Sequence, residues 1–207
     1  MIKFVFFDIG GVVVKDFSGT HKWEELIEEL GIPSTDRSKF DKVWGKYSDK
    51  VCTTFDVDDL LPILKKEFNI KISQDYSLLT GFVSRFEVNK EIWPVVLKIK
   101  KEVPVGLLSN MYLRMKDKLD AACLFPPIDW DVIIDSSVLK LQKPDPAIYK
   151  LAEEKAKVKG SSILFVDNTQ GHLDGAKKFN WQTFLFDPRK NSESCNNLLD
   201  YFNMNKD

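Results

Sequence analysis

The chain has 207 residues, and its 30 lysine and arginine side chains against 31 aspartate and glutamate side chains give a formal net charge of −1. At roughly 100–200 residues per domain, this length corresponds to one domain, or to one domain with an insertion. Because 43% of the residues are hydrophobic and 12% aromatic, the chain can bury a core, which excludes the disordered and fibrous classes. The balanced charge gives no electrostatic reason to expect nucleic acid or an anionic membrane as a partner.

The cysteines and the N-terminal residues indicate a cytoplasmic protein. Cys52, Cys123 and Cys195 are an odd number and lie far apart, so they fit neither a disulfide framework nor a zinc motif. The first apolar run ends at Asp8, which is too short for a signal peptide. No apolar run approaches the roughly 18–20 residues that span a bilayer. We therefore expect reduced thiols, a cytoplasmic location and no membrane segment.

Five short apolar runs predict the strands of a sheet. They are nearly continuous in hydrophobic residues and do not alternate with polar ones, which is typical of parallel strands covered on both faces. The runs are Lys3–Ile9, Val103–Asn110, Asp131–Asp135, Ser162–Asn168 and Gln182–Asp187.

Helical patterns separate these runs in the second half of the chain. Asp145 and Pro146 are typical of an N-cap followed by proline in the first helical turn, and they predict a helix over Ala147–Lys157. Further helices are expected over Ile92–Ile99, Gly171–Phe179 and Asn191–Asp207. The alternation of strands and helices predicts an α/β, Rossmann-like fold, with a mostly parallel sheet and helices on both faces.

One stretch, from about Asp16 to Val88, looks helical throughout and contains no convincing strand. Apolar residues with helical spacing mark helices over Trp23–Leu30 and Leu60–Phe68. We expect a small helical cap over residues 16–88, inserted into a core made of residues 1–15 and 89–207.

Four polar segments follow or precede the predicted elements, where an α/β sheet binds ligands. The first is Asp8-Ile9-Gly10-Gly11, in which the aspartate is a candidate nucleophile or a simple turn residue. In the second, Ser109 and Asn110 end a strand and can bond to ligand oxygens or start a helix.

The third segment places Lys143 just outside a capped helix N-terminus. A cation there favours an anion, although an exposed loop lysine is the commoner case. In the fourth, Asp167-Asn168-Thr169 ends a strand, so it can cap the next helix or, together with Asp8, bind Mg²⁺.

The order and spacing of these four segments resemble the motifs of the haloacid dehalogenase (HAD) superfamily, over nearly the whole chain. The runs Pro144–Tyr149 and Ile163–Asn168, followed by Gly175-Ala176-Lys177-Lys178, are similar to typical members. The helical insertion after the first motif is similar to the C1-type cap of this superfamily. The resemblance implies an enzyme, a hydrolase that acts through a covalent intermediate.

The resemblance also implies a role for each motif residue. Asp8 would be the nucleophile that forms an aspartyl-phosphate. Ser109 would bind oxygens of the transferred group, and Lys143 would neutralise charge on the nucleophile and the phosphoryl group. The residues expected to bind the phosphoryl group are Gly10, Gly11, Ser109, Asn110 and Lys143.

The expected cofactor is Mg²⁺. By resemblance, Asp8, Asp167 and the backbone carbonyl of Gly10 would hold the ion, and Asn168 would support that site.

The chain departs from the phosphatase pattern at Gly10, where these enzymes usually carry an acid/base aspartate. Losing such a group costs about 10²–10⁴-fold in rate. Another residue could substitute, the leaving group could need little protonation, or catalysis could have decayed. Asp16 and His21 are the nearby substitutes. Glycine here also resembles a branch that includes sugar-phosphate phosphatases and domains related to the N-terminal part of soluble epoxide hydrolase.

We therefore expect a Mg²⁺-dependent phosphatase acting on a small phosphorylated metabolite. A catalytically weak or silent HAD-like binding protein is the alternative that Gly10 supports. A metal-independent 2-haloacid dehalogenase is the second alternative; the Ser109-Asn110 pair resembles that branch, but Asp167 has no role there. Aromatic residues of the cap either stack on a substrate or pack against one another: Trp23, Trp44, Tyr47 and Phe55. The sequence is compatible with a monomer or a homodimer.

Overall fold

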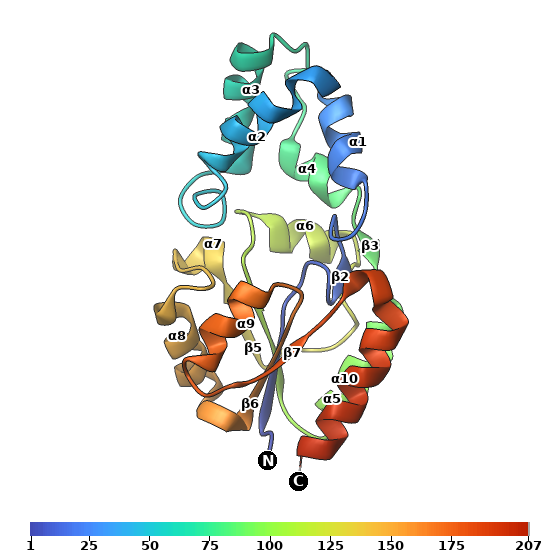
Figure 1. Cartoon of the computed structure of the whole chain (residues 1–207), viewed down its shortest axis with the longest axis vertical. Coiled ribbons are helices and arrows are strands. Elements are labelled where there is room, and N and C mark those ends of the chain that lie inside the picture. Colours follow the sequence, from blue (N-terminus) through green and yellow to red (C-terminus); the bar gives the residue numbers. More distant parts are fainter. Residues whose placement is uncertain (207) are drawn as a thin grey trace.

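The computed structural model describes residues 1–206. Asp207 ends both the predicted C-terminal helix and the predicted core, and it lies outside the described residues. Within them the main sheet has five parallel strands in the order β5-β4-β1-β6-β7 (Figure 1). The strands are β1 (Phe4–Phe7), β4 (Val105–Ser109), β5 (Val132–Asp135), β6 (Ile163–Asp167) and β7 (Gln182–Leu185). Each lies inside one predicted run, and the predicted α/β fold is confirmed.

Both faces of the sheet are covered, which explains the continuous apolar runs. Val5 and Phe7 of β1 point into one core, whereas Phe4 and Phe6 belong to a second core on the opposite face. Helices α5 (Ile92–Lys100) and α10 (Asn191–Asn205) pack over the first face, and α8 (Pro146–Ala156) and α9 (Gln170–Lys177) over the second (Figure 1). Shorter helices follow β4 and β5: α6 (Met115–Ala121) and α7 (Ser136–Leu139).

The start of α8 confirms the predicted cap. The Asp145 carboxylate accepts a hydrogen bond of 2.8 Å from the backbone N–H of Ala147, and Pro146 is the first helical residue. This arrangement satisfies one of the free N–H groups of the first turn. The segment immediately before α8, which carries Lys143, is thereby fixed against the sheet.

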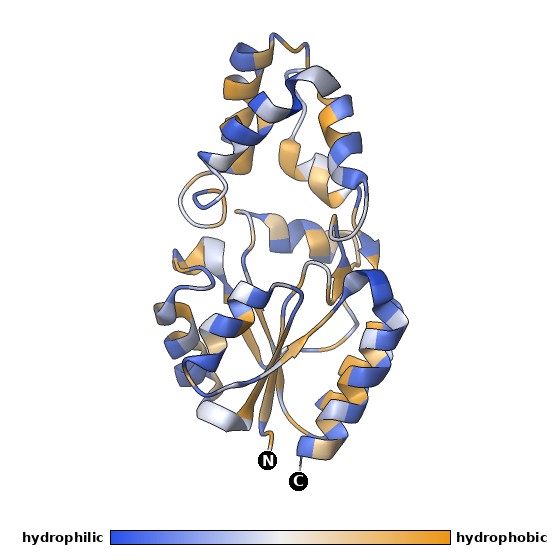
Figure 2. Ribbon diagram, viewed as in Figure 1, coloured by the Kyte–Doolittle hydropathy of each residue, from blue (hydrophilic) through white to orange (hydrophobic). Residues whose placement is uncertain are grey.

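Four helices form a separate group beyond the carboxyl ends of the strands (Figure 1). They are α1 (Lys22–Glu29), α2 (Arg37–Gly45), α3 (Leu60–Phe68) and α4 (Leu78–Val83). Figure 2 shows hydrophobic and hydrophilic residues interspersed along these helices. Buried residues from each of them, such as Leu26, Phe40, Leu64 and Phe82, belong to the larger core.

The prediction that the stretch from Asp16 to Val88 contains no strand is wrong at the C-terminal end of that stretch. The chain enters and leaves the helical group through an antiparallel pair, β2 (Val14–Lys15) and β3 (Glu87–Val88). Each strand has two residues, so neither leaves a measurable alternation in the sequence.

Ion pairs and hydrogen bonds connect the helical group to the sheet. The Arg114 guanidinium, which follows β4, lies 2.6 Å from Asp56 and 3.0 Å from Asp58. The Ser136 hydroxyl donates a 2.7 Å hydrogen bond to the carbonyl of Cys52. The cysteines Cys52, Cys123 and Cys195 are free. Within residues 1–206 no helix combines the length and the apolarity needed to cross a membrane.

Candidate active site

Three neighbouring strands bring their carboxyl ends together at the site. Asp8 follows β1, Ser109 is the last residue of β4, and Asp167 is the last residue of β6. Because β1 pairs in parallel with both β4 and β6, the three side chains lie at one edge of the sheet. All three are buried, with 7%, 2% and 0% of their surface exposed.

Lys143 is buried between the two carboxylates, with 2% of its surface exposed, so it is no ordinary loop lysine. Its Nζ lies 2.6 Å from Asp167 Oδ2 and 3.0 Å from Asp8 Oδ1. A buried cation needs such partners, because an unpaired charge is strongly disfavoured away from water. Lys143 therefore links the two acidic residues into one charged cluster.

Asn110 holds this lysine in place. Its side-chain oxygen accepts a 2.8 Å hydrogen bond from the Lys143 N–H, and its amide nitrogen donates a 2.9 Å hydrogen bond to the Lys143 carbonyl. Both ends of the Asn110 side chain are thus bonded to the backbone of Lys143. The side chain of Asn110 is therefore not free to bind a phosphoryl group. The expected contact stays a prediction, and it would be made by the backbone N–H of Asn110.

The carboxylates of the cluster differ in acidity. Burial and the nearby Asp167 raise the pKa of Asp8, against the opposing effects of Lys143 and Ser109. Burial also acts to raise the pKa of Asp167, but Lys143 and His172 outweigh it and lower this pKa overall. Asp167 is therefore the stable anion, and Asp8 depends on a neighbouring cation to carry its charge.

His172 is a site residue that the sequence analysis missed. It lies on α9, and its Nδ1 is 3.0 and 3.2 Å from the two carboxylate oxygens of Asp167. Asp8, Asp167 and His172 each offer a ligand atom, and these atoms lie within 4.8 Å of one another. The only feature of the sequence that could have indicated this residue is its position, because it lies in the first helical turn after the fourth motif.

The donor set fits a hard divalent cation. Asp8 Oδ1 is buried and has no hydrogen-bond partner, although Lys143 lies 3.0 Å away. Two carboxylates are oxygen ligands of the kind that Mg²⁺ prefers, and the expected contribution of the Gly10 carbonyl stays a prediction. The imidazole of His172 is a less usual ligand for Mg²⁺ and suits transition metals better. Asn168 donates a 3.0 Å hydrogen bond to the Ser18 hydroxyl.

The space beside Gly10 is filled by Asp16. A Cβ atom at Gly10 would lie 2.5 Å from Asp16 Oδ2 and 3.2 Å from its Cγ. The other carboxylate oxygen of Asp16 accepts a 2.8 Å hydrogen bond from the Ser18 N–H. Burial raises the pKa of Asp16. His21, the other candidate substitute, is exposed just before α1.

Gly11 has a different constraint. Its φ angle is +75°, and a Cβ atom there would lie 2.2 Å from the Asn168 amide nitrogen. Only glycine adopts this backbone conformation without strain and allows so close an approach. Gly11 thus shapes the turn that follows Asp8.

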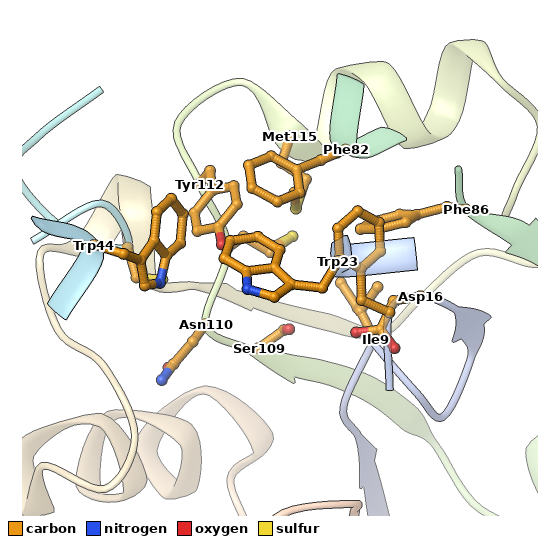
Figure 3. A pocket seen from close by; sticks show the side chains of 14 residues that line it. Ile9, Asp16, Trp23, Trp44, Phe82, Phe86, Ser109, Asn110, Tyr112 and Met115 are labelled. Carbon is orange, nitrogen blue, oxygen red and sulfur yellow. The ribbon is translucent and has the colours of Figure 1, made fainter. Parts of the chain in front are cut away.

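A cavity of about 360 Å³ lies between the helical group and these strand ends (Figure 3). Ser109 and Asp16 border it on the sheet side, and Trp23 and Trp44 border it on the side of the helical group. Tyr47 and Phe55, which were also candidates for stacking on a substrate, are not in its lining and pack against each other with ring centroids 5.0 Å apart.

The fold and the site define an α/β protein whose polar cluster lies at the carboxyl ends of its central strands, beneath a helical insertion. The family model of the haloacid dehalogenase-like hydrolases matches residues 2–180. The chain therefore belongs to this family of hydrolases.

Individual relatives are distant. Phosphatase MT3486 of Mycobacterium tuberculosis is 23% identical over 196 residues, which cover 90% of this chain and 88% of that protein. The (S)-2-haloacid dehalogenase 2 of a Pseudomonas species is 33% identical over 137 residues, 65% of this chain and 59% of that protein. A mutant HAD family enzyme from Bacteroides thetaiotaomicron, solved with magnesium and inorganic phosphate, superposes with a TM-score of 0.73 at 16% identity, covering 90% of this chain and 94% of that one.

Proposed function

We propose that the protein is a Mg²⁺-dependent phosphatase that acts on a small phosphorylated metabolite. The observation that carries the proposal is the buried cluster of Asp8, Lys143 and Asp167, in which Asp8 Oδ1 has no hydrogen-bond partner. Two carboxylates around one ammonium leave a net negative charge. That charge suits a divalent cation that in turn attracts a phosphate ester.

In the first step, a carboxylate oxygen of Asp8 attacks the phosphorus atom. The bond between phosphorus and the leaving-group oxygen breaks, and an aspartyl-phosphate forms on Asp8. The Lys143 ammonium and the Ser109 hydroxyl, with the backbone N–H groups of Gly10 and Asn110, stabilise the equatorial oxygens. The expected contact of Gly11 with the phosphoryl group is wrong, because the Gly11 N–H donates a 2.9 Å hydrogen bond to the Val14 carbonyl. Bound Mg²⁺, held by Asp8, Asp167 and the carbonyl of Gly10 with Asn168 in support, would neutralise further charge on these oxygens.

Asp16 is the residue that takes the place of the missing acid/base group. Its carboxylate fills the space that a side chain at Gly10 would occupy, beside the nucleophile. Protonated Asp16 donates its proton to the departing alkoxide. In the second step it removes a proton from the water that hydrolyses the aspartyl-phosphate, which regenerates Asp8 and releases inorganic phosphate.

Two comparisons support the assignment to phosphatases over the other branches. A relative that matches 90% of the chain is named a phosphatase, and a structural neighbour was solved with magnesium and inorganic phosphate. By the same resemblance we assign residues 16–88 to a C1-type cap and residues 1–15 and 89–207 to the core.

The dehalogenase alternative is favoured by the 33% identity to a haloacid dehalogenase. Against this alternative stands Asp167, which has no role in a metal-independent dehalogenase and here forms the second carboxylate of the cluster with Asp8 and Lys143. This second carboxylate favours the phosphatase.

The test is phosphate release from an aryl phosphate and from a panel of alkyl, sugar and acyl phosphates. It is run with Mg²⁺, with EDTA, and with Asp8→Asn as the control for contaminating enzymes. We expect activity that both EDTA and Asp8→Asn abolish. Folded protein that binds Mg²⁺ but turns over none of the esters would favour the binding-protein alternative. Halide release from 2-haloacids in the presence of EDTA would favour the dehalogenase.

A further inference from the structure

The cavity beside Asp8 has the composition of a site for an uncharged apolar group. Most of its lining is aromatic or otherwise apolar, and the residues come from both the helical group and the sheet (Figure 3). The aromatic members are Phe17, Trp23, Trp44, Phe82, Phe86 and Tyr112. Its volume of about 360 Å³ falls within the range of roughly 300–1,000 Å³ for small-molecule sites.

These aromatic rings form one connected wall. Trp23 contacts Trp44 edge to face with centroids 4.8 Å apart, and it stacks on Phe82 at 5.7 Å. Phe82 in turn lies 5.2 Å from Tyr112, which follows β4. Trp23, Trp44 and Tyr112 are only partly buried, so their rings keep free surface for a ligand. Rings fixed by one another offer contact area at a low entropic cost.

Charge restricts the occupant further. Asp16 is the only charged side chain in this lining within residues 1–206, and its carboxylate lies against Gly10, at the end nearest Asp8. Lys143 is already paired with Asp8 and Asp167, and Arg114 is paired with Asp56 and Asp58. A leaving group with a second negative charge would meet no free cation here.

Polyols are disfavoured for a related reason. Each buried hydroxyl without a partner is costly, because it loses its hydrogen bonds to water. Asn110, the one amide in the lining, already bonds with both ends to Lys143. The other polar groups of the lining are the Asp16 carboxylate, the Ser109 and Tyr112 hydroxyls and the Trp23 and Trp44 indole N–H groups, and most of the surface that a sugar would cover is apolar.

We propose that the preferred substrates are phosphate monoesters of apolar alcohols that carry a ring, with the ring held between Trp23, Trp44 and Tyr112. This inference rests on the proposed phosphatase function and specifies its substrate class. The phosphoryl group would lie at Asp8, and the ester oxygen beside Asp16, at the border of the aromatic wall.

The test compares three esters of primary alcohols, so that their leaving groups resemble one another chemically. Benzyl phosphate carries an apolar ring, glycerol phosphate a polyol, and choline phosphate a cation. We expect kcat/KM for benzyl phosphate to exceed the other two by about tenfold or more. Equal values, or a preference for glycerol phosphate or choline phosphate, would overturn the proposal while leaving phosphatase activity established.

Variants of Trp44 test whether the preference for benzyl phosphate depends on the aromatic wall. Trp44→Phe and Trp44→Ala should raise KM for benzyl phosphate progressively, to fivefold or more for alanine, and should raise KM for methyl phosphate by a clearly smaller factor. Phe55→Leu is the matched control, because Phe55 is a cap aromatic outside the lining. A loss shared equally by benzyl and methyl phosphates would contradict the assignment.

A binding measurement separates failure of this inference from failure of the proposed function. Benzylphosphonate cannot be hydrolysed, and its ring would lie against two of the five tryptophans of the chain. We expect it to change the tryptophan fluorescence at concentrations at least tenfold below those needed with methylphosphonate, with or without turnover. If no ester is hydrolysed in an Asp8-dependent manner, the phosphatase proposal fails, and this measurement still decides whether the cavity binds apolar rings. Equal responses to both phosphonates would show that it does not.

Discussion

At the scale of single residues, the charged cluster depends on one lysine. Lys143 has no exposed side-chain surface and contacts both Asp8 and Asp167. Two carboxylates buried at this distance repel each other, and the ammonium between them reverses that repulsion. The pairing therefore holds the ends of two strands, β1 and β6, and the loop that carries Lys143 together electrostatically.

Lys143→Met should destabilise the protein by about 3–5 kcal/mol at pH 7, because it leaves Asp8 buried without a cation and leaves Asp167 with His172 alone. Without Lys143 the pKa of Asp8, which burial and Asp167 already raise, rises further. Protonation then favours the folded state, so the loss should shrink as the pH is lowered from 8 to 5. Urea unfolding across this range measures both effects, and Mg²⁺ should restore part of the stability.

Lys150→Met, on the exposed side of α8, is the matched control and should stay within about 0.5 kcal/mol of wild type. A Lys143→Met protein as stable as this control would contradict the role of the cluster.

We expect that the acid/base carboxylate can be moved from position 16 to position 10. Asp16→Ser should lower kcat for an alkyl phosphate by about 10²–10⁴-fold and lower it much less for an aryl phosphate whose leaving group needs little protonation. Gly10→Asp alone should be unfavourable, because its Cβ would lie 2.5 Å from the Asp16 carboxylate. The double variant moves the acid to position 10 and should recover alkyl phosphatase activity.

Steady-state kinetics on the two classes of ester measure the exchange. If Asp16→Ser reduced kcat equally for aryl and alkyl phosphates, Asp16 would have a structural role only.

At the scale of elements, the helical group shares the larger hydrophobic core with one face of the sheet and is also joined to it by polar contacts. The chain passes between the two through the β2–β3 pair, and Arg114 forms ion pairs with Asp56 and Asp58. Burial acts to raise the pKa of Asp58, but the Leu79 N–H and the Arg114 guanidinium lower it overall. This ion pair therefore holds residues 56–58 of the helical group against the segment that follows β4.

Arg114→Met should loosen the helical group while changing global stability by only about 1 kcal/mol or less, because the pair is partly exposed. Hydrogen exchange should become faster in residues 56–60 and 77–83. The folded-state pKa of Asp58 is depressed, so its contribution is present above the ordinary value of 3.8 and is lost as the pH falls through the folded-state value. Wild type and variant should therefore converge at such low pH.

Arg37→Met serves as the control, since Arg37 pairs with Glu24 and Asp41 inside the helical group. Equal exchange in Arg114→Met and Arg37→Met would show that Arg114 does not hold residues 56–58 in place.

At the scale of the whole molecule, the strand order places the site. The chain forms β1, β4 and β5 outward to one side, then crosses back to add β6 and β7 on the other side of β1. The two directions of winding diverge beside β1, which leaves a crevice at the carboxyl ends of the central strands. The helical group lies over that crevice, so the same topology creates both the charged cluster and the cavity.

The packing of the whole molecule should also govern thiol reactivity. Burial raises the pKa of Cys52 and of Cys195 to about 12, whereas Cys123 is exposed. Since the thiolate is the reactive form, a disulfide reagent at pH 8 should label Cys123 quickly, the partly exposed Cys52 much more slowly, and the buried Cys195 only after unfolding. Cys123→Ser should remove the fast reaction, and fast labelling of two thiols in that variant would contradict the packing around Cys52 and Cys195.

The local sequence was sufficient for much of the fold. Continuous apolar runs identified the five strands, because strands buried on both faces need hydrophobic residues at every position. Asp145 and Pro146 identified the start of α8, because capping depends on adjacent residues. The same reasoning missed β2 and β3, where two residues per strand are too few for a periodic signal.

The charged cluster was expected only through resemblance to a family, and its geometry required the folded chain. Asp8, Lys143 and Asp167 are far apart in sequence and meet because β1 pairs with β6 and the start of α8 is anchored beside them. His172 and Asp16 show most clearly what the local sequence could predict and what required the folded chain. The sequence by itself determined which strands carry acidic residues at their ends. Only the tertiary structure decided that Asp16 fills the space beside Gly10, that His172 contacts Asp167, and that aromatic rings from two parts of the chain line one cavity. These contacts depend on how the elements pack and not on the spacing of residues along the chain.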